Sequence, residues 1–145
     1  MSKRANYYQL NRPAIDALSA VGKQLTSIDP KLRALIELRV SQINGCVFCV
    51  DRHSTEARAA GETQQRLDCL VAWRESRLFD EPERAALEWA EAVTHVSHTH
   101  APDAAYDGLV PHYSENQIVD LTLIVANMNA WNRIAIGHRV QPARR

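Results

Sequence analysis

The chain has 145 residues, of which 17 are Lys or Arg, 17 are Asp or Glu and 46% are hydrophobic. This length suits a single domain over residues 1–145 with a buried core of its own. The formal net charge of zero argues against a protein that binds nucleic acid or an anionic membrane, because such proteins carry a basic surplus. No apolar run reaches the ~18 residues of a membrane span. The opening residues lack the apolar core of a secretory signal, so we expect a cytoplasmic protein.

Helix start and stop signals recur along the whole chain. Asp29-Pro30 offers an N-cap followed by proline at the first helical position, and Ser114 with Gln117 forms a capping-box pattern. Apolar residues follow such signals at spacings of three and four, and no segment shows the alternation of a strand. The sequence therefore predicts an all-α, single-domain bundle of about six helices. Their expected ranges are 13–26, 30–43, 46–60, 63–76, 82–96 and 115–136, and residues 97–113 form a link with a short helix from Pro102.

The helix expected at 115–136 is apolar in almost every direction. Such a helix must be buried on all sides, and in a chain this short a partner subunit is a natural cover for its far face. We therefore expect a homo-oligomer. Four polar residues interrupt this helix. Because buried amides must be hydrogen-bonded, they either satisfy an interface or line the site: Asn127, Asn129, Asn132 and Arg133.

The three cysteines do not form the disulfide framework of a secreted protein, because they are few and odd in number. Cys46 and Cys49 form a C-x-x-C pair, which in a cytosolic protein is more often used for redox chemistry or metal binding. Cys69 has no partner near it in the sequence, so we expect it to pack as a small hydrophobic residue.

The segment with the clearest chemistry begins where Asn44 and Gly45 break one helix and Cys46 starts the next. At about 100° per residue, Cys46, Cys49 and His53 fall within an arc of about 60°. Both thiols and the imidazole therefore share one narrow face, turned toward the core or a cleft. A helix N-terminus favours the thiolate over the thiol, and His53 can take a proton from Cys49 one turn earlier.

Two cysteines three residues apart at a helix start can close a disulfide without unfolding the helix. This permits a cycle in which a thiolate attacks an oxidant, the sulfenic acid condenses with its neighbour, and an external reductant reopens the disulfide. Two other interpretations remain open. The pair and His53 pack in the core without chemistry, or Cys46, Cys49 and His53 supply three zinc ligands, for which the sequence shows no obvious fourth.

Two charged residues precede the cysteines on the same predicted helix. Glu37 belongs to a series of spacing four that includes Cys49 and His53, so it could orient the imidazole ring as the third member of a triad does. The alternative is an ordinary solvated helix position. Arg39 lies at the centre of the apolar stripe and needs a carboxylate partner, for which Glu37 is a candidate.

Three histidines near the end of the helix at 82–96 look at first like a metal cluster. Their position favours a simpler interpretation, because histidine interacts favourably with the dipole at a helix C-terminus. The residues are His95, His98 and His100.

At the cysteine segment the chain resembles the alkyl hydroperoxidase D-like family, part of the carboxymuconolactone decarboxylase superfamily. The resemblance covers most of the chain, and it is carried by ALIELRVSQINGCVFCVDRHSTEARAAG, with support from NYYQL near the start and NMNAWNRIA near the end. It implies an all-helical fold that assembles as trimers or hexamers. It also implies a thiol-dependent hydroperoxide reductase in which Cys49 attacks the peroxide, Cys46 resolves it and accepts reducing equivalents, His53 is the base, and Glu37 heads a proton relay.

The chain departs from the best-known members at two positions. They place the relay glutamate twelve residues before the first cysteine, where this chain has Ala34, and Glu37 lies one helical turn later. They also carry a histidine between the cysteines, where this chain has Phe48. The decarboxylase branch does not depend on a C-x-x-C pair, so the two thiols favour the redox branch.

We therefore expect a thiol peroxidase that reduces alkyl hydroperoxides or hydrogen peroxide, without metal, flavin or haem. Its reductant would be a dithiol partner, either lipoyl-linked or thioredoxin-like. Three alternatives remain: a lactone decarboxylase or isomerase that uses His53 as base, a zinc-binding interaction module, and a disulfide-exchange or redox-sensing protein without peroxide turnover.

Overall fold

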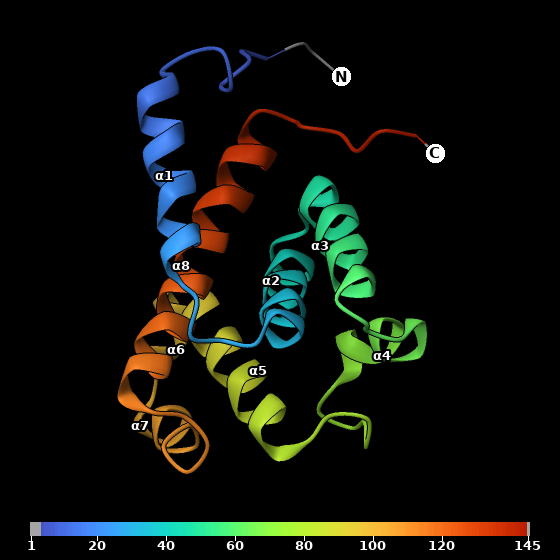
Figure 1. The fold of residues 1–145 in the computed structure, drawn as a ribbon, viewed down its shortest axis with the longest axis vertical. Coiled ribbons are helices and arrows are strands. Elements are labelled where there is room, and N and C mark those ends of the chain that lie inside the picture. Colours follow the sequence, from blue (N-terminus) through green and yellow to red (C-terminus); the bar gives the residue numbers. More distant parts are fainter. Residues whose placement is uncertain (1–3, 145) are drawn as a thin grey trace.

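The computed structural model describes residues 4–144, and every regular element within that range is a helix (Figure 1). Residues 1–3 and 145, the ends of the domain expected from the sequence, lie outside the described residues. The all-α prediction is confirmed, although the link at 97–113 holds two short helices instead of one. The elements are α1 (Arg12–Gln24), α2 (Pro30–Asn44), α3 (Val47–Ala59), α4 (Gln64–Cys69), the 3-10 turn η1 (Leu70–Ala72), α5 (Glu81–Thr94), α6 (Val96–Thr99), α7 (Asp103–Asp107) and α8 (Glu115–Gly137).

Helix α2 lies at the centre of the bundle and packs against α3, α5 and α8. It begins where the sequence predicts, because the Asp29 carboxylate accepts hydrogen bonds from the backbone N–H groups of Lys31 and Leu32, and Pro30 takes the first position. It ends at Gly45, whose φ of 70° is a left-handed conformation that residues with a side chain adopt only at a cost. This turn directs the chain from α2 into α3.

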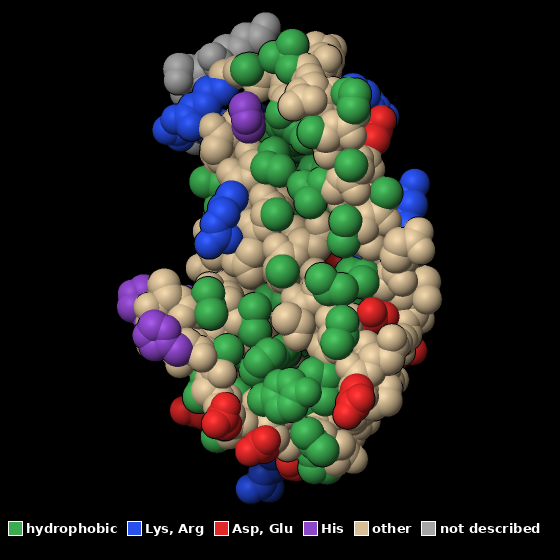
Figure 2. All heavy atoms as spheres, turned by 90° about the vertical axis from the view of Figure 1, so that its left-hand side faces the viewer, with side chains coloured by type: hydrophobic (Ala, Val, Ile, Leu, Met, Phe, Trp, Pro, Cys, Tyr) green, Lys and Arg blue, Asp and Glu red, His purple; other side chains and the backbone are tan. Residues whose placement is uncertain are grey.

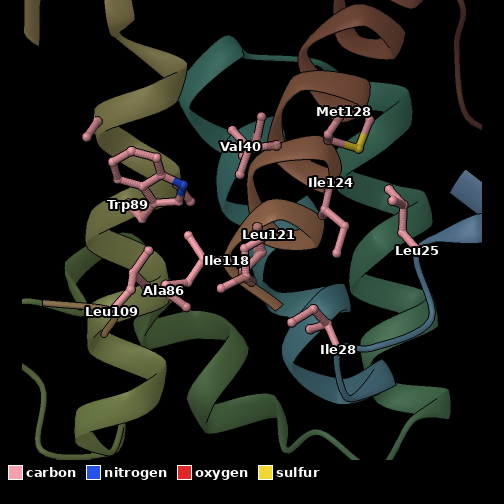
Figure 3. Packing of buried hydrophobic residues seen from close by; sticks show 14 of the residues in the cluster. Leu25, Ile28, Val40, Ala86, Trp89, Leu109, Ile118, Leu121, Ile124 and Met128 are labelled. Atoms are coloured by element: carbon pink, nitrogen blue, oxygen red, sulfur yellow. The ribbon is translucent and has the colours of Figure 1, made fainter. Parts of the chain in front are cut away.

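The main core forms where α8 packs against α2 and α5 (Figure 3). Ile118, Leu121 and Ile124 of α8 are each 3% exposed or less. A second cluster includes Leu35 and Leu38, on another side of α2. Burial of this apolar surface, worth about 25 cal/mol per Å², fixes α2 between two cores. Polar side chains that α2 presents between these cores are therefore held on a rigid support.

The helix predicted at 63–76 is wrong beyond Cys69, where α4 gives way to the 3-10 turn and an irregular segment. The Arg84 guanidinium of α5 explains how the irregular backbone is stabilised. It donates hydrogen bonds to the carbonyl oxygens of Trp73, Arg74 and Ser76 at 2.8–3.1 Å. Carbonyl groups that a continuing helix would have satisfied are thus bonded by a side chain from a distant part of the sequence.

Helix α8 begins with the predicted capping box, in which the Ser114 hydroxyl and the Gln117 side chain each bond the other's backbone N–H. Its apolar face is only partly covered. Val119, Leu123 and Ile136 are 55%, 41% and 45% exposed. Hydrophobic side chains gather on the side of the molecule that carries α1, α6, α7 and α8 (Figure 2). Among the residues described, none of the helices combines the length and apolar character needed to cross a membrane.

Two of the asparagines that interrupt α8 join it to the end of α2. The Asn44 amide donates to the side-chain oxygens of Asn129 and Asn132, at 3.0 and 2.9 Å. Asn132, which is fully buried, donates in turn to the Ser41 hydroxyl at 3.1 Å. These amides are therefore satisfied within the chain, and they hold the segment that leads into the cysteines.

Candidate active site

The two cysteines lie at the start of α3. Cys46 is the N-cap residue, and its Sγ accepts a hydrogen bond from the backbone N–H of Cys49 at 3.3 Å. The two residues are joined as a disulfide, with their Cα atoms 5.3 Å apart. As the helical phasing predicts, Cys49 and His53 lie on one buried face, with 4% and 7% of their surface exposed.

A cavity of about 490 Å³ opens beside Cys49. Its lining comes from α1, α2, α3 and α8, and the segment before α1 contributes Tyr7 and Tyr8. Cys49, His53 and Glu37 all line this cavity. Three of the four residues predicted for the site are therefore brought together around one space, and its volume falls in the range of about 300–1,000 Å³ typical of ligand pockets.

The fourth predicted residue, Cys46, faces another way. It is 1% exposed and lines a separate cavity of about 140 Å³. That second cavity also includes Val47, Ile136, Arg139 and Val140, which come from the start of α3 and from the end of α8 with the residues that follow it. The two residues of one disulfide thus line different cavities.

His53 is held between two carboxylates. Its Nδ1 lies 2.8 Å from an oxygen of Glu56 and 3.4 Å from an oxygen of Glu37. Neither oxygen meets the angular geometry of a hydrogen bond to Nδ1, so the contacts are best described as ion pairs. Burial lowers the pKa of His53, but the two carboxylates outweigh this effect and raise it above its ordinary value of 6.5. The imidazolium form therefore persists to a higher pH than in an unperturbed histidine.

Glu37 is fixed by Arg33, one turn earlier on α2. The guanidinium donates to the Glu37 carboxylate at 3.0 Å and to the carbonyl oxygens of Gly22 and Leu25, which ties the end of α1 to the site. Burial raises the pKa of Glu37, but the combined effect of His53 and Arg33 in lowering it is larger, so the pKa lies below its ordinary value. With 14% of its side chain exposed, Glu37 does not occupy a solvated position.

The sequence suggested Glu37 as a partner for Arg39, and this prediction is wrong. The Arg39 guanidinium lies 2.8 Å from the Glu91 carboxylate of α5, and it also donates to Gln42. Glu91 accepts a further hydrogen bond from the Trp73 indole at 2.8 Å. Arg39 therefore joins α2 to α5, and the Glu37 carboxylate contacts His53 without competition from Arg39.

Two residues of the site were missed from the sequence. Glu56 follows His53 by three residues, a spacing that places both on one helix face, and Arg33 precedes Glu37 by four. Contact with His53 is the main cause that lowers the pKa of Glu56 to about 2, against a smaller opposing effect of burial and with help from Arg52. Helical spacing was the signal that could have identified both residues.

The structure also tests which residues could hold a metal ion. Within the described range, the group whose ligand atoms converge, all within 4.8 Å, is Glu37, His53 and Glu56. Its carboxylates are already paired with Arg33 and Arg52. The zinc set considered from the sequence is not assembled, because Cys46 and Cys49 are joined as a disulfide and do not offer two thiolate ligands.

Cys69 and the three histidines after α5 lie outside the site. Cys69 is a free, half-buried thiol at the end of α4. His95 caps the C-terminus of α5 as expected, and His98 contacts the Ser97 hydroxyl through Nδ1 at 3.1 Å. None of these residues lines the cavity that contains Cys49.

Comparison with known proteins identifies the family. A model described as the carboxymuconolactone decarboxylase family matches residues 13–92. The uncharacterised protein YdfG of Bacillus subtilis is 43% identical over 138 residues, which cover 94% of this chain and 94% of that protein. The chain belongs to the carboxymuconolactone decarboxylase family. The uncharacterised protein YnjA of Escherichia coli is 32% identical over 107 residues, which cover 74% of this family member but 58% of YnjA.

Solved structures place this member of the carboxymuconolactone decarboxylase family among proteins with the AhpD fold. A protein of unknown function from Agrobacterium tumefaciens, described as a candidate antioxidant defence protein AhpD, superposes with a TM-score of 0.95 at 39% identity over 99% of this chain and all of that one. The debrominase Bmp8 superposes with a TM-score of 0.81 at 24% identity, covering 92% of this chain and 73% of Bmp8. The second likeness shows that an enzyme is built on the same fold.

Proposed function

We propose that this protein is a thiol peroxidase that reduces alkyl hydroperoxides or hydrogen peroxide through Cys49 and Cys46. The observation that carries the proposal is the shared cavity of Cys49, His53 and Glu37, with Cys46 at disulfide distance on another side. A peroxide that enters the large cavity meets a sulfur atom and a proton donor on consecutive turns of α3. The proposal rests on this geometry and on the C-x-x-C pair within the family fold.

The reaction begins with the reduced pair. The Cys49 thiolate attacks one peroxide oxygen, the O–O bond breaks, and the departing alkoxide takes a proton to leave as an alcohol. Cys49 is then a sulfenic acid. The Cys46 thiolate attacks its sulfur and expels hydroxide, which takes a proton to become water, and the disulfide seen in the structure is formed.

His53 and the two carboxylates supply the proton. Because Glu37 and Glu56 contact Nδ1, Nε2 is the ring nitrogen left to exchange a proton within the cavity. A raised pKa keeps the imidazole protonated over a wider pH range, which stabilises a neighbouring thiolate and provides an acid for the alkoxide.

The second cavity supports a division of roles between the sulfur atoms. A dithiol reductant that attacks Cys46 from the second cavity releases the Cys49 thiolate beside His53, and the second thiol of the reductant then frees Cys46. The reductant becomes a disulfide, so its two electrons balance those consumed by the peroxide. We propose a lipoyl-linked or thioredoxin-like dithiol for this role.

The test is anaerobic mixing of the fully reduced protein with one equivalent of cumene hydroperoxide, followed by alkylation and peptide mass spectrometry. We expect one equivalent of alcohol and a Cys46–Cys49 disulfide, while Cys69 remains free for alkylation and serves as the internal reference. If the peroxide persists, or if oxidation appears at Cys69 instead of the pair, the proposed peroxidase activity is wrong.

A further inference from the structure

The cavity that contains Cys49 has more positive than negative side chains in its lining. Lys23, Arg33 and Arg52 face two carboxylates, those of Glu37 and Glu56. Arg33 pairs with Glu37, and Arg52 pairs with Glu56. Lys23 lines the cavity as an exposed residue and forms no ion pair with any residue between 4 and 144. The cavity therefore keeps a surplus positive charge on α1, which increases when His53 is protonated.

Gly22, which precedes the exposed Lys23 on α1, lies close to nitrogen donors of two other helices. A Cβ atom on Gly22 would come within 3.2 Å of Nη2 of Arg33 and 3.3 Å of Nδ2 of Asn127. Arg33 uses Nε and Nη1 for its hydrogen bonds, which leaves Nη2 available. The Nδ2 group of Asn127 is a second nitrogen donor at this place, and no hydrogen bond to the described residues is formed by it. Two such donors suit an anionic acceptor of a ligand, whereas the buried Oδ1 of Asn127, which also lacks a partner among those residues, is an acceptor and does not contribute to binding an anion.

The remainder of the cavity wall is largely apolar. Phe48 precedes Cys49 on α3, and Met128 and Trp131 lie one turn apart on α8. All three pack on the main core, which fixes the wall. Hydrogen peroxide would occupy only a small part of a cavity of about 490 Å³ and would leave this wall without a contact.

We infer that the cavity accepts an amphiphilic organic hydroperoxide, with an apolar body against Phe48, Met128 and Trp131 and a carboxylate at the end marked by Lys23, Arg33 and Asn127. The hydroperoxide group then meets Cys49. This inference rests on the proposed function, because it names the substrate class of the same site. Lys23 is a specificity-determining residue in it, since it recognises the carboxylate and takes no part in the reaction.

The first test measures binding without turnover. The oxidised protein is titrated by calorimetry with 4-isopropylbenzoate and with its neutral analogue 4-isopropylbenzamide. We expect the benzoate to bind at least tenfold more tightly, a difference of about 1.4 kcal/mol. Lys23→Gln should remove most of this preference and Lys23→Arg should restore it. Arg58→Gln, which removes an exposed charge of α3 outside the cavity lining, should change neither affinity.

The second test measures turnover of cumene hydroperoxide and of its para-carboxylate. Lys23→Gln should raise KM for the acidic hydroperoxide about tenfold and leave its kcat, and both constants for cumene hydroperoxide, unchanged. Equal binding of benzoate and benzamide, or a Lys23→Gln variant that discriminates like the wild type, would overturn the inference while peroxidase activity could persist. Selective benzoate binding by a protein that consumes no peroxide would instead refute the proposed function and leave the anion site standing.

Discussion

Cys46 and Cys49 are identical residues placed in different surroundings, and their exchange for serine should therefore have different effects. Cys49→Ser removes the sulfur that lines the large cavity with His53, so peroxide consumption should fall to the background rate. Cys46→Ser keeps the attacking thiolate but removes the residue that resolves it. This variant should complete at most one turnover and then hold a sulfenic acid at Cys49, measurable with dimedone and mass spectrometry.

Cys69→Ser is the matched control for these variants, because Cys69 lies outside both cavities and should be replaceable without loss of activity. Continuous turnover by Cys46→Ser at the wild-type rate would show that the roles are assigned to the wrong sulfur atoms. The same result would remove any need for the second cavity in the reduction step.

The pair of His53 and Glu56 predicts a pH dependence of stability. Glu56, whose pKa falls from 4.5 to about 2, contributes stability above pH 4.5 that is lost as the pH falls toward 2. His53, whose pKa is raised, contributes stability below its ordinary value of 6.5 that is lost as the pH rises through the folded value. The pair therefore stabilises the fold most between pH 4.5 and 6.5.

Glu56→Gln should consequently lower the free energy of unfolding most in this window. The loss should be no more than about 1 kcal/mol, since the Glu56 side chain is 43% exposed and partly screened by solvent. The His53 pKa, followed by the NMR signal of its ring, should fall in the variant. Glu88→Gln, which removes an exposed carboxylate paired with Arg74, should leave that signal unchanged. An unaltered His53 titration in Glu56→Gln would contradict the contact.

The residues that could be predicted from the sequence are those whose partners lie within one or two turns of a helix. Cys49, His53 and Glu37 were found by helical phasing, and Glu56 could have been found in the same way. The partner of Arg39 could not, because Glu91 lies on another helix 52 residues along the chain. A charge in an apolar stripe predicts that a partner exists, but only the packing of α2 on α5 identifies it.

At the scale of the elements, the turn between α2 and α3 positions the cysteines. Gly45 adopts a φ of 70° there, and a Cβ atom would meet nothing within 4 Å, so only the backbone conformation opposes a side chain. Gly45→Ala should lower the free energy of unfolding by about 1–2 kcal/mol, the cost of a left-handed conformation for a residue with a Cβ atom. Chemical denaturation measures this change.

Gly137→Ala is the matched control, because Gly137 also has open space around it but lies within α8 without a positive φ. Alanine stabilises a helix relative to glycine, so this variant should be as stable as the wild type or slightly more stable. Equal destabilisation by both substitutions would show that the conformation of Gly45 is not what the turn requires.

Element boundaries followed the sequence where local signals control them. Asp29-Pro30 and the Ser114–Gln117 box start α2 and α8 as predicted. The end of α4 could not be predicted in this way, because the apolar periodicity of the sequence continues beyond Cys69. There the Arg84 side chain donates hydrogen bonds to the carbonyl groups of the irregular segment that replaces the helix. A boundary set by a distant side chain leaves no mark in the local sequence.

At the scale of the whole molecule, the exposed apolar surface remains to be explained. Val119 and Leu123 lie one turn apart on α8 and are 55% and 41% exposed. Val96, Tyr106 and Val110, from neighbouring elements, are also 41–57% exposed. Hydrophobic side chains gather on this side of the chain (Figure 2). Such a patch is characteristic of an interface, and it supports the proposal that this face contacts further copies of the chain.

The last prediction concerns this face. The protein should form a homo-oligomer, a trimer or hexamer, in light scattering coupled to size exclusion at micromolar concentration. Leu123→Glu places a charge where apolar contacts are needed and should shift the mass toward the monomer. Val71→Glu is the control, because Val71 is 64% exposed on η1, away from α8, and should leave the mass unchanged. If the wild-type protein elutes as a monomer, the exposed apolar face of α8 is not an interface between copies of this chain. The face would then have another purpose, because exposure of an apolar helix surface to water is unfavourable.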